Sequence, residues 1–179
     1  MFDAPGLQLA TVVEPLPRPP TDDDLDDLAQ LLVDAVDSDA GVSFMRPLSA
    51  DAARTWWRQT VESSDRRALF LVARDAQGIV GTIQLHPAWA PNQPHRADVA
   101  KLIVHRRARR RGVGRALVDA VETHARGAGF TLLTLDTVRG DAAEQLYAAA
   151  GWQRVGVIPD YALSPAGTLC DTVVFYKKL

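Results

Sequence analysis

The sequence predicts one α/β (or α+β) domain, built on a mixed, mostly antiparallel sheet of about seven strands with helices on both faces. Strand and helix patterns follow the order strand, two helices, three strands, helix, strand, helix, two strands. The unit at 97–136 has the length of a right-handed parallel crossover, whereas the hairpins around it require antiparallel pairing. The 179 residues, 47% of them hydrophobic, suffice for one core and contain no repeat or linker that would divide them.

The first half of the chain is expected to hold one strand, two helices and a hairpin. Residues 7–13 are mostly apolar and stop at a proline-rich segment, which predicts a strand and then a break. Apolar residues at helical spacing predict helices at 22–37 and 49–63. The apolar runs 68–74 and 79–86 flank a short turn, which predicts a hairpin.

The second half is expected to hold four more strands and two helices. Its elements are a strand at 96–105, a helix from about 112 to 127, a strand at 131–138, a helix at 141–151 and strands at 152–158 and 168–178, with a loop at 159–167. The run at 131–138 is nearly all apolar, as a strand buried on both faces would be.

Composition excludes several classes of protein. The formal net charge is −2 and the pI is about 6.1, whereas a protein that mainly neutralises a nucleic-acid backbone is usually basic. The single cysteine, Cys170, cannot form an internal disulfide. The chain starts without a leader pattern and has no apolar run long enough to span a membrane. We therefore expect a cytoplasmic protein with no nucleic-acid or membrane partner. No residue grouping has metal-ligand spacing, so no metal is expected.

Six arginines fall within residues 105–115 and lead directly into a glycine pair and an apolar helix pattern. This segment follows a predicted strand, and ligands of open sheets with parallel units bind at the carboxyl ends of the strands. Free amides in the first turn of a helix bind phosphate, and glycines let it approach the backbone. The sequence therefore predicts a phosphate cradle here. The alternatives are a solvated basic face and a nucleic-acid contact through 106–115.

Two segments resemble the GNAT superfamily of N-acetyltransferases. KLIVHRRARRRGVGRALVDAVE is similar to the acyl-CoA-binding segment of that family, with its Arg/Gln-x-x-Gly-x-Gly/Ala loop, and AAEQLYAAAGWQRVG is similar to a later helix with the pattern Ala-x-x-Leu-Tyr-x-x-x-Gly-Phe/Trp. The resemblance covers residues 97–156 in motif and nearly the whole chain in element order. It implies one domain over 1–179, a cofactor-binding core at 97–156 and a splayed parallel strand pair. GVSFM, LDT, QRVGVIPDYALSPAGTLC and VVFYKKL also resemble the tabtoxin-resistance branch, whose members acetylate a small β-lactam amino acid.

The resemblance also implies how acetyl-CoA, the co-substrate, would bind. The backbone of Leu102, Ile103 and Val104 would pair with the pantetheine arm. The pyrophosphate would be held by Arg109, Arg110, Arg111, Gly112, Val113 and Gly114, with Arg115 in the same turn. Gly140 stands where many members of the superfamily have a cofactor-contacting asparagine, so that role is not transferred.

Two residues are expected to carry the chemistry. Tyr147 matches the tyrosine of the family, which implies a general acid, or at least a donor, toward the CoA thiolate. The alternative is a tyrosine packed under the helix. Asp136 is expected to end an otherwise nearly all apolar strand at its carboxyl edge, and a carboxylate there could bind the substrate ammonium and accept its proton. It could instead cap the following loop, and Asp98 is a second candidate base.

The acceptor side is expected to involve the loop between the first two helices. Phe44 and Met45 in this loop, and Tyr161 before the last strand, are the candidate substrate-binding residues, with simple packing as the alternative. The predicted function is acetyl-CoA-dependent acetylation of a primary amine on a small molecule, possible targets including an amino-acid-like β-lactam antimicrobial. Acetylation of protein or peptide amines is the main alternative, and a homodimer is left open.

Overall fold

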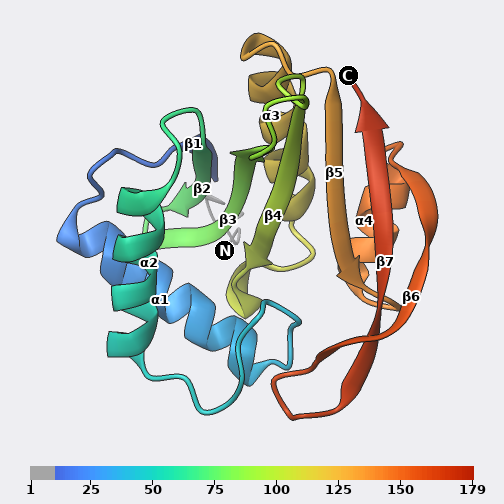
Figure 1. The fold of residues 1–179 in the computed structure, drawn as a ribbon. Helices are drawn as coiled ribbons and strands as arrows, with labels where there is room; N and C mark the ends of the chain where they lie inside the picture. Colours follow the sequence, from blue (N-terminus) through green and yellow to red (C-terminus); the bar gives the residue numbers. More distant parts are fainter. Residues whose placement is uncertain (1–10) are drawn as a thin grey trace, which may run out of the picture.

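Seven strands form one mixed sheet, in the order β1-β2-β3-β4-β5-β7-β6, in the computed structural model, which describes residues 11–179 (Figure 1). The strands are β1 Val12–Pro15, β2 Leu69–Asp75, β3 Gly78–Pro87, β4 Arg96–Val104, β5 Leu132–Val138, β6 Gln153–Leu163 and β7 Leu169–Lys178. The helices are α1 Asp22–Asp37, α2 Ala50–Ser63, α3 Val113–Gly127 and α4 Ala142–Ala149, with a 3-10 turn, η1, at Arg106–Ala108. The predicted element order is confirmed. Residues 7–10 of the expected first strand lie outside the described residues.

Helices cover both faces of the sheet, as predicted (Figure 1). On one face, α1 and α2 bury a cluster that includes Leu28 and Trp57 against Phe70 of β2. On the other face, α3 and α4 pack on the sheet around Leu117 and Phe175. Each helix places its apolar residues on one stripe, which is why a single sheet can carry a core on each side. No helix in residues 11–179 is long and apolar enough to cross a membrane.

The parallel pair of the sheet is splayed. β4 and β5 pair only at Arg96↔Leu132, Ala97↔Leu133 and Asp98↔Thr134, and beyond these positions the two strands separate. An irregularity between β3 and β4 accompanies the separation, because Thr82 pairs with Ile103 while Gln84 pairs with Ala100. One residue of β3 therefore faces two of β4, which is the pattern of a β-bulge. The bulge and the early end of pairing open the sheet on the C-terminal side of β4.

One expected boundary and one expected burial pattern are wrong. β6 does not end at Ile158 but runs to Leu163, and the segment predicted as a loop pairs with β7 at Ala162↔Cys170 and Leu163↔Leu169. A register shift between Ile158 and Ala162, with Asp160 at φ 51°, lets the strand resume after Pro159. Tyr161 therefore lies on a strand rather than in a loop. β5 ends at Val138, as expected, so Asp136 lies two positions before the end of the strand. The strand is not buried on both faces, because the side chain of Asp136 is exposed.

Candidate active site

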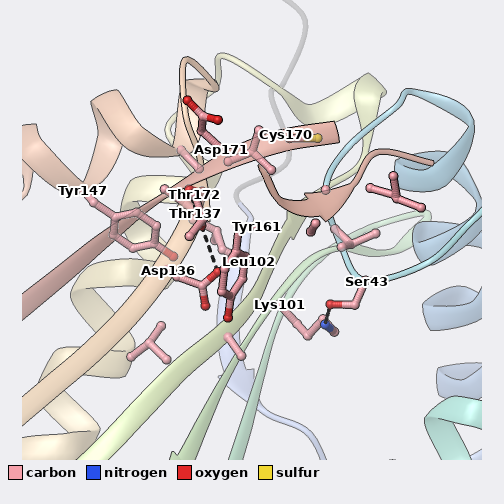
Figure 2. A pocket seen from close by; sticks show the side chains of 18 residues that line it. Ser43, Lys101, Leu102, Asp136, Thr137, Tyr147, Tyr161, Cys170, Asp171 and Thr172 are labelled. Atoms are coloured by element: carbon pink, nitrogen blue, oxygen red, sulfur yellow. Dashed lines mark hydrogen bonds between the residues drawn. The ribbon is translucent and has the colours of Figure 1, made fainter. Parts of the chain in front are cut away.

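A cavity of about 260 Å³ lies where β4 and β5 separate (Figure 2). Its walls come from β4, β5, the start of α4, the outer strands β6 and β7, and residues 41–43 of the α1–α2 loop. Segments from both halves of the chain therefore meet at the break in the parallel pair. In an open sheet, ligands bind at this position because the diverging strands leave a crevice between them.

Tyr147 reaches the cavity from α4 and is 4% exposed. Its ring packs against Trp152 at 5.4 Å and Phe175 at 6.3 Å between ring centroids, which fixes its orientation. Figure 2 shows its hydroxyl turned toward Asp136. Burial, and then the negative charge of Asp136, raise the pKa of Tyr147 above its ordinary value. The phenol therefore stays protonated at neutral pH, as a hydrogen-bond donor must.

Asp136 projects from β5 into the same cavity. The hydroxyl of Thr172 lies 3.0 Å from Asp136 Oδ2 and 2.9 Å from the carbonyl oxygen of Thr137, and it can donate to one of them at a time. No cationic side chain in residues 11–179 lies within 4.0 Å of this carboxylate. Asp136 therefore has acceptor capacity left for a ligand, and it does not cap the helix that follows. The N-cap of α4 is Asp141, although its side chain makes no capping hydrogen bond.

Lys101 is a cavity residue that the sequence analysis missed. It lies in the bulge of β4 with a left-handed backbone, φ 52°, and its Nζ donates to Ser43 Oγ at 2.9 Å (Figure 2). Burial lowers the pKa of Lys101, and the charge of Asp136 partly opposes this. The available signal was a single lysine within the otherwise apolar run that ends β4.

Only one of the three expected substrate-binding residues lines the cavity. Tyr161 lines the cavity from β6. Phe44 and Met45 do not line it, since Phe44 packs edge-on against Trp56 at 5.0 Å and Met45 is 46% exposed. Their neighbours at 41–43 form the wall of the cavity instead.

The α1–α2 loop touches the turn between β6 and β7 across one side of the cavity. The amide of Arg46 donates to the carbonyl of Pro165 at 3.0 Å, and the amide of Ala166 donates to Asp39 Oδ1 at 3.1 Å. Arg46 also pairs with Asp39 at 3.0 Å. The two backbone-amide contacts join residues more than a hundred positions apart and hold the loop that carries cavity residues 41–43 against the turn that follows cavity residue Leu163.

The first arginines of the basic stretch are bound within the protein. Arg106 pairs with Asp34 of α1 through its guanidinium and through its backbone amide, the latter at 3.0 Å. The guanidinium of Arg107 donates two hydrogen bonds, of 2.5 and 3.2 Å, to the carboxylate of Asp75. Burial, the largest single influence, raises the pKa of Asp75. The hydrogen bonds from Arg107 and from the amide of Gln77, together with the charges of Arg107 and Arg111, outweigh it and hold that pKa below its ordinary value. These two side chains anchor the start of the segment to α1 and to the end of β2.

The later part of the stretch forms an open helix start. Arg110 and Arg111 are exposed, and Gly112 caps α3 with a left-handed φ of 81° and no atom within 4 Å of where a Cβ would stand. Ala116 is the first residue whose amide bonds back, to the carbonyl of Gly112, so the amides of residues 113–115 have no helical acceptor. Exposed guanidinium groups beside free amides and open space fit a pyrophosphate.

The other residues of this turn connect it to the cavity. Gly114 packs against α4, because an added Cβ would stand 3.1 Å from Leu146 Cδ2. Arg109 donates to the carbonyl of Val104 at 3.0 Å, and Arg115 pairs with Asp119 at 2.8 Å. Val113 is buried in the core. The helix start therefore adjoins both the end of β4 and the residue before Tyr147.

The strand residues expected to meet an acyl carrier lie on the splayed part of β4. Leu102 lines the cavity, Ile103 points into the core beneath α1 and Val104 ends the strand. None of them pairs with β5, whose partners on β4 stop at Asp98. The backbone of this segment is therefore free on the side of β5.

Asp98, the second candidate base, is bound elsewhere. Its carboxylate pairs with Arg96 at 2.5 Å and accepts the hydroxyl of Thr134, at the closed end of the strand pair. It does not line the cavity. Within residues 11–179, no three histidine, cysteine or carboxylate side chains are grouped so that they could hold a metal ion.

Comparison with known proteins decides the family. Residues 28–152, more than half of the chain, match the model of the acetyltransferase (GNAT) family. The chain belongs to this family. The splayed strands, the glycine turn at the start of α3 and the tyrosine of α4 are thus found in a GNAT acyltransferase, which agrees with the resemblance found in the sequence.

Solved structures share the fold over nearly their whole length. A ribosomal-protein-alanine N-acetyltransferase from Brucella melitensis is 20% identical with a TM-score of 0.76, covering 94% of this chain and 99% of its own. A structure provisionally named as a phosphinothricin N-acetyltransferase is 17% identical, with a TM-score of 0.78 and coverages of 95% and 99%. A protein of Salmonella typhimurium, solved with its cofactor acetyl-CoA, is 15% identical, with a TM-score of 0.73 and coverages of 95% and 94%. At these identities the likeness shows the fold of the GNAT enzymes and not their substrates.

Proposed function

We propose that this GNAT enzyme transfers the acetyl group of acetyl-CoA to the primary amine of a small molecule. The observation that carries the proposal is that Tyr147 and Asp136 face one cavity at the splay of β4 and β5, next to an open helix start. A phenol and a carboxylate in one cavity suit a reaction in which one group loses a proton and another gains one.

Acetyl-CoA, when bound, supplies an acetyl group activated as a thioester. Its pyrophosphate would lie on the turn from Arg109 to Arg115, and its pantetheine arm would run along Leu102–Val104, where the backbone lacks a strand partner. This route leads from the start of α3 toward Tyr147, because Gly114 packs on the residue before it.

The protein supplies the proton transfers. Asp136 would hold the acceptor ammonium and take one proton from it, which leaves the neutral amine that attacks. Tyr147 would donate to the departing sulfur, and its raised pKa keeps the proton on the phenol until then. The acceptor ammonium loses two protons on becoming an amide. The first passes through Asp136 to water, and the second, lost from the nitrogen after attack, restores Tyr147, so that the thiol gains one proton and one is released.

The acceptor is inferred to be small. The contacts of Arg46 and Asp39 with residues 165–166 tie the α1–α2 loop, which supplies cavity residues 41–43, to the β6–β7 turn, whereas a protein terminus would need an open groove between them. We infer further that the acceptor is an amino-acid-like antimicrobial, such as a β-lactam amino acid, detoxified in the cytoplasm by a single domain spanning 1–179. This finer assignment is supported by the resemblance of four sequence segments to the tabtoxin-resistance branch.

Two measurements test the proposal. The first is thermal melting with and without acetyl-CoA. A ligand at a hundred times its Kd adds about 2.7 kcal/mol, a shift of several degrees for a chain of this size. Gly112→Glu should abolish the shift, because it puts a bulky anion in the helix start.

The second measurement is CoA release with a panel of amino acids, other small amines and peptides. Release with peptides only would favour the protein-directed alternative, and no release with any acceptor would refute acetyl transfer.

A further inference from the structure

We propose that Lys101 forms an anion-binding subsite for the acceptor, so that the enzyme selects a primary amine that also carries a carboxylate. The inference rests on the acetyl transfer proposed above and adds the second charged group of the acceptor. It follows from where the cavity places its charges.

The backbone of β4 directs Lys101 to the cavity. The residue lies where the bulge inserts an extra position opposite β3, and its φ of 52° is in the left-handed region. A lysine without special function rarely adopts this conformation, since its Cβ crowds the backbone there. Strained residues of this kind concentrate at ligand sites, where the surrounding structure maintains them.

The cavity holds opposite charges that do not pair with each other. Asp171 is already engaged, because it accepts from Arg139 at 3.1 Å and from the amide of Asp160 at 3.2 Å. Asp136 and Lys101 both line the cavity, yet within residues 11–179 neither has an ion-pair partner within 4.0 Å. A ligand carrying an ammonium and a carboxylate would satisfy both. Burial disfavours the charged form of Lys101, and the carboxylate of the ligand would stabilise that form again.

Lys101 has donors to spare for this task. An ammonium group has three N–H donors, and the hydrogen bond to Ser43 uses one. The amine also stands 5.9 Å from the ring centre of Trp56 in α2, whereas Ser43 belongs to the α1–α2 loop, so Lys101 contacts both segments. A purely structural role in pinning that loop would affect all acceptors alike, whereas an anion subsite would affect only acceptors with an acid group. That difference makes the two roles separable.

The first arm of the test compares matched acceptors. Rates of CoA release are measured for the proteinogenic L-amino acids and for their primary carboxamides, which keep the amine and lack the negative charge. The wild type should prefer the acids in kcat/KM. Lys101→Met keeps the chain length but removes the charge, and it should reduce that preference roughly tenfold to a hundredfold, as expected when one charge-assisted hydrogen bond is lost. Lys101→Arg should retain part of it, and Lys178→Met, at an exposed lysine of β7, should leave it unchanged.

The second arm needs no turnover. The chain has three lysines, so labelling lysine with ¹³C at Cε gives three signals, and Lys101→Met identifies one. With coenzyme A present, the acids should shift the Lys101 signal and the carboxamides should not. Equal use of acids and carboxamides, or a Lys101 signal that no acid moves, would overturn the subsite while leaving amine acetylation intact. An acid-responsive Lys101 signal with no CoA release from any amine would support the subsite and reject acetyl transfer.

Discussion

The carboxylate of Asp34 binds Arg106 twice, through its guanidinium and through its backbone amide at 3.0 Å, although 72 positions separate the two residues. Asp34 is buried, and Arg109 and His105 also approach it, at 3.9 and 3.8 Å. One side chain of α1 therefore fixes the beginning of the basic stretch, and this stretch leads into the turn at 109–115 that is proposed to bind the pyrophosphate.

Asp34→Asn should weaken both the fold and cofactor binding. The amide cannot replace the charge-assisted bonds, so unfolding free energy should fall by about 1–3 kcal/mol. The affinity for acetyl-CoA should fall as well, because the turn at 109–115 is no longer anchored. Denaturant unfolding and calorimetric titration measure the two effects. Asp37→Asn, on an exposed residue of the same helix, is the control and should change neither.

Gly112→Ala should destabilise the protein by about 1–2 kcal/mol through backbone strain alone. Its left-handed φ of 81° disfavours any side chain, while the space around it is open. Gly127→Ala, at the other end of α3, meets nothing within 4 Å and has no left-handed backbone, so it should be neutral or stabilise by up to about 1 kcal/mol. Equal melting temperatures for the two variants would contradict the strain at Gly112.

Tyr147→Phe should lower kcat about a hundredfold or more, the range for loss of a proton donor. The ring contacts with Trp152 and Phe175 survive, so melting temperature and acetyl-CoA affinity should stay close to wild type. Steady-state kinetics with melting as control separates these effects. Normal turnover by this variant would remove the assigned role.

Asp136→Asn should raise KM for the amine and lower kcat, with little change in the Kd for acetyl-CoA. The amide oxygen can still accept from Thr172, which keeps the local hydrogen bond, but it can neither take a proton nor pair with an ammonium. Activity should recover partly at higher pH, where more of the acceptor amine is neutral. A pH profile parallel to that of the wild type would argue that Asp136 only positions β5.

His86 should make stability depend on pH in the weakly acidic range. Burial lowers the pKa of His86 below its ordinary value of 6.5, so the unfolded chain binds the proton more readily than the folded one. This contribution is fully present above pH 6.5 and is lost as the pH falls through that value toward the lower folded pKa. Compared with His86→Gln, the wild type should therefore lose more unfolding free energy between about pH 7 and pH 5. Parallel curves of unfolding free energy against pH for the two proteins would disprove a contribution from His86.

Much of the fold could be predicted from local patterns. α1 lies at the predicted residues 22–37, where Thr21 and Asp24 form a capping box that fixes its start. The parallel pair could be predicted because the strand–helix–strand unit at 97–136 has the length and the central helix typical of a parallel crossover. The end of β6 could not be predicted, because Pro159 interrupts the pattern and only pairing with β7 restores the strand.

The candidate site was predictable where a motif marks it and not where contacts decide. The turn at 109–115 follows from its arginines and glycines between a strand and a helix, and Tyr147 follows from the resemblance to the GNAT family. The sequence could not predict that Asp98 is bound by Arg96 while Asp136 faces the cavity, because this depends on where β4 and β5 stop pairing. Lys101 escaped notice because a bulge, which depends on the partner strand, reverses the side to which a strand residue points.

The end of pairing between β4 and β5 gives this sheet an edge in its middle. Peptide groups at an edge exchange their amide hydrogens with water more readily than paired ones. We expect amides of residues 99–104 that face β5 to exchange quickly in the free enzyme and slowly once an extended amide chain lies against them. In this picture the bound co-substrate acts as an eighth strand of the sheet. Its hydrogen bonds to β4 form when it binds and break when the product leaves, once in each turnover.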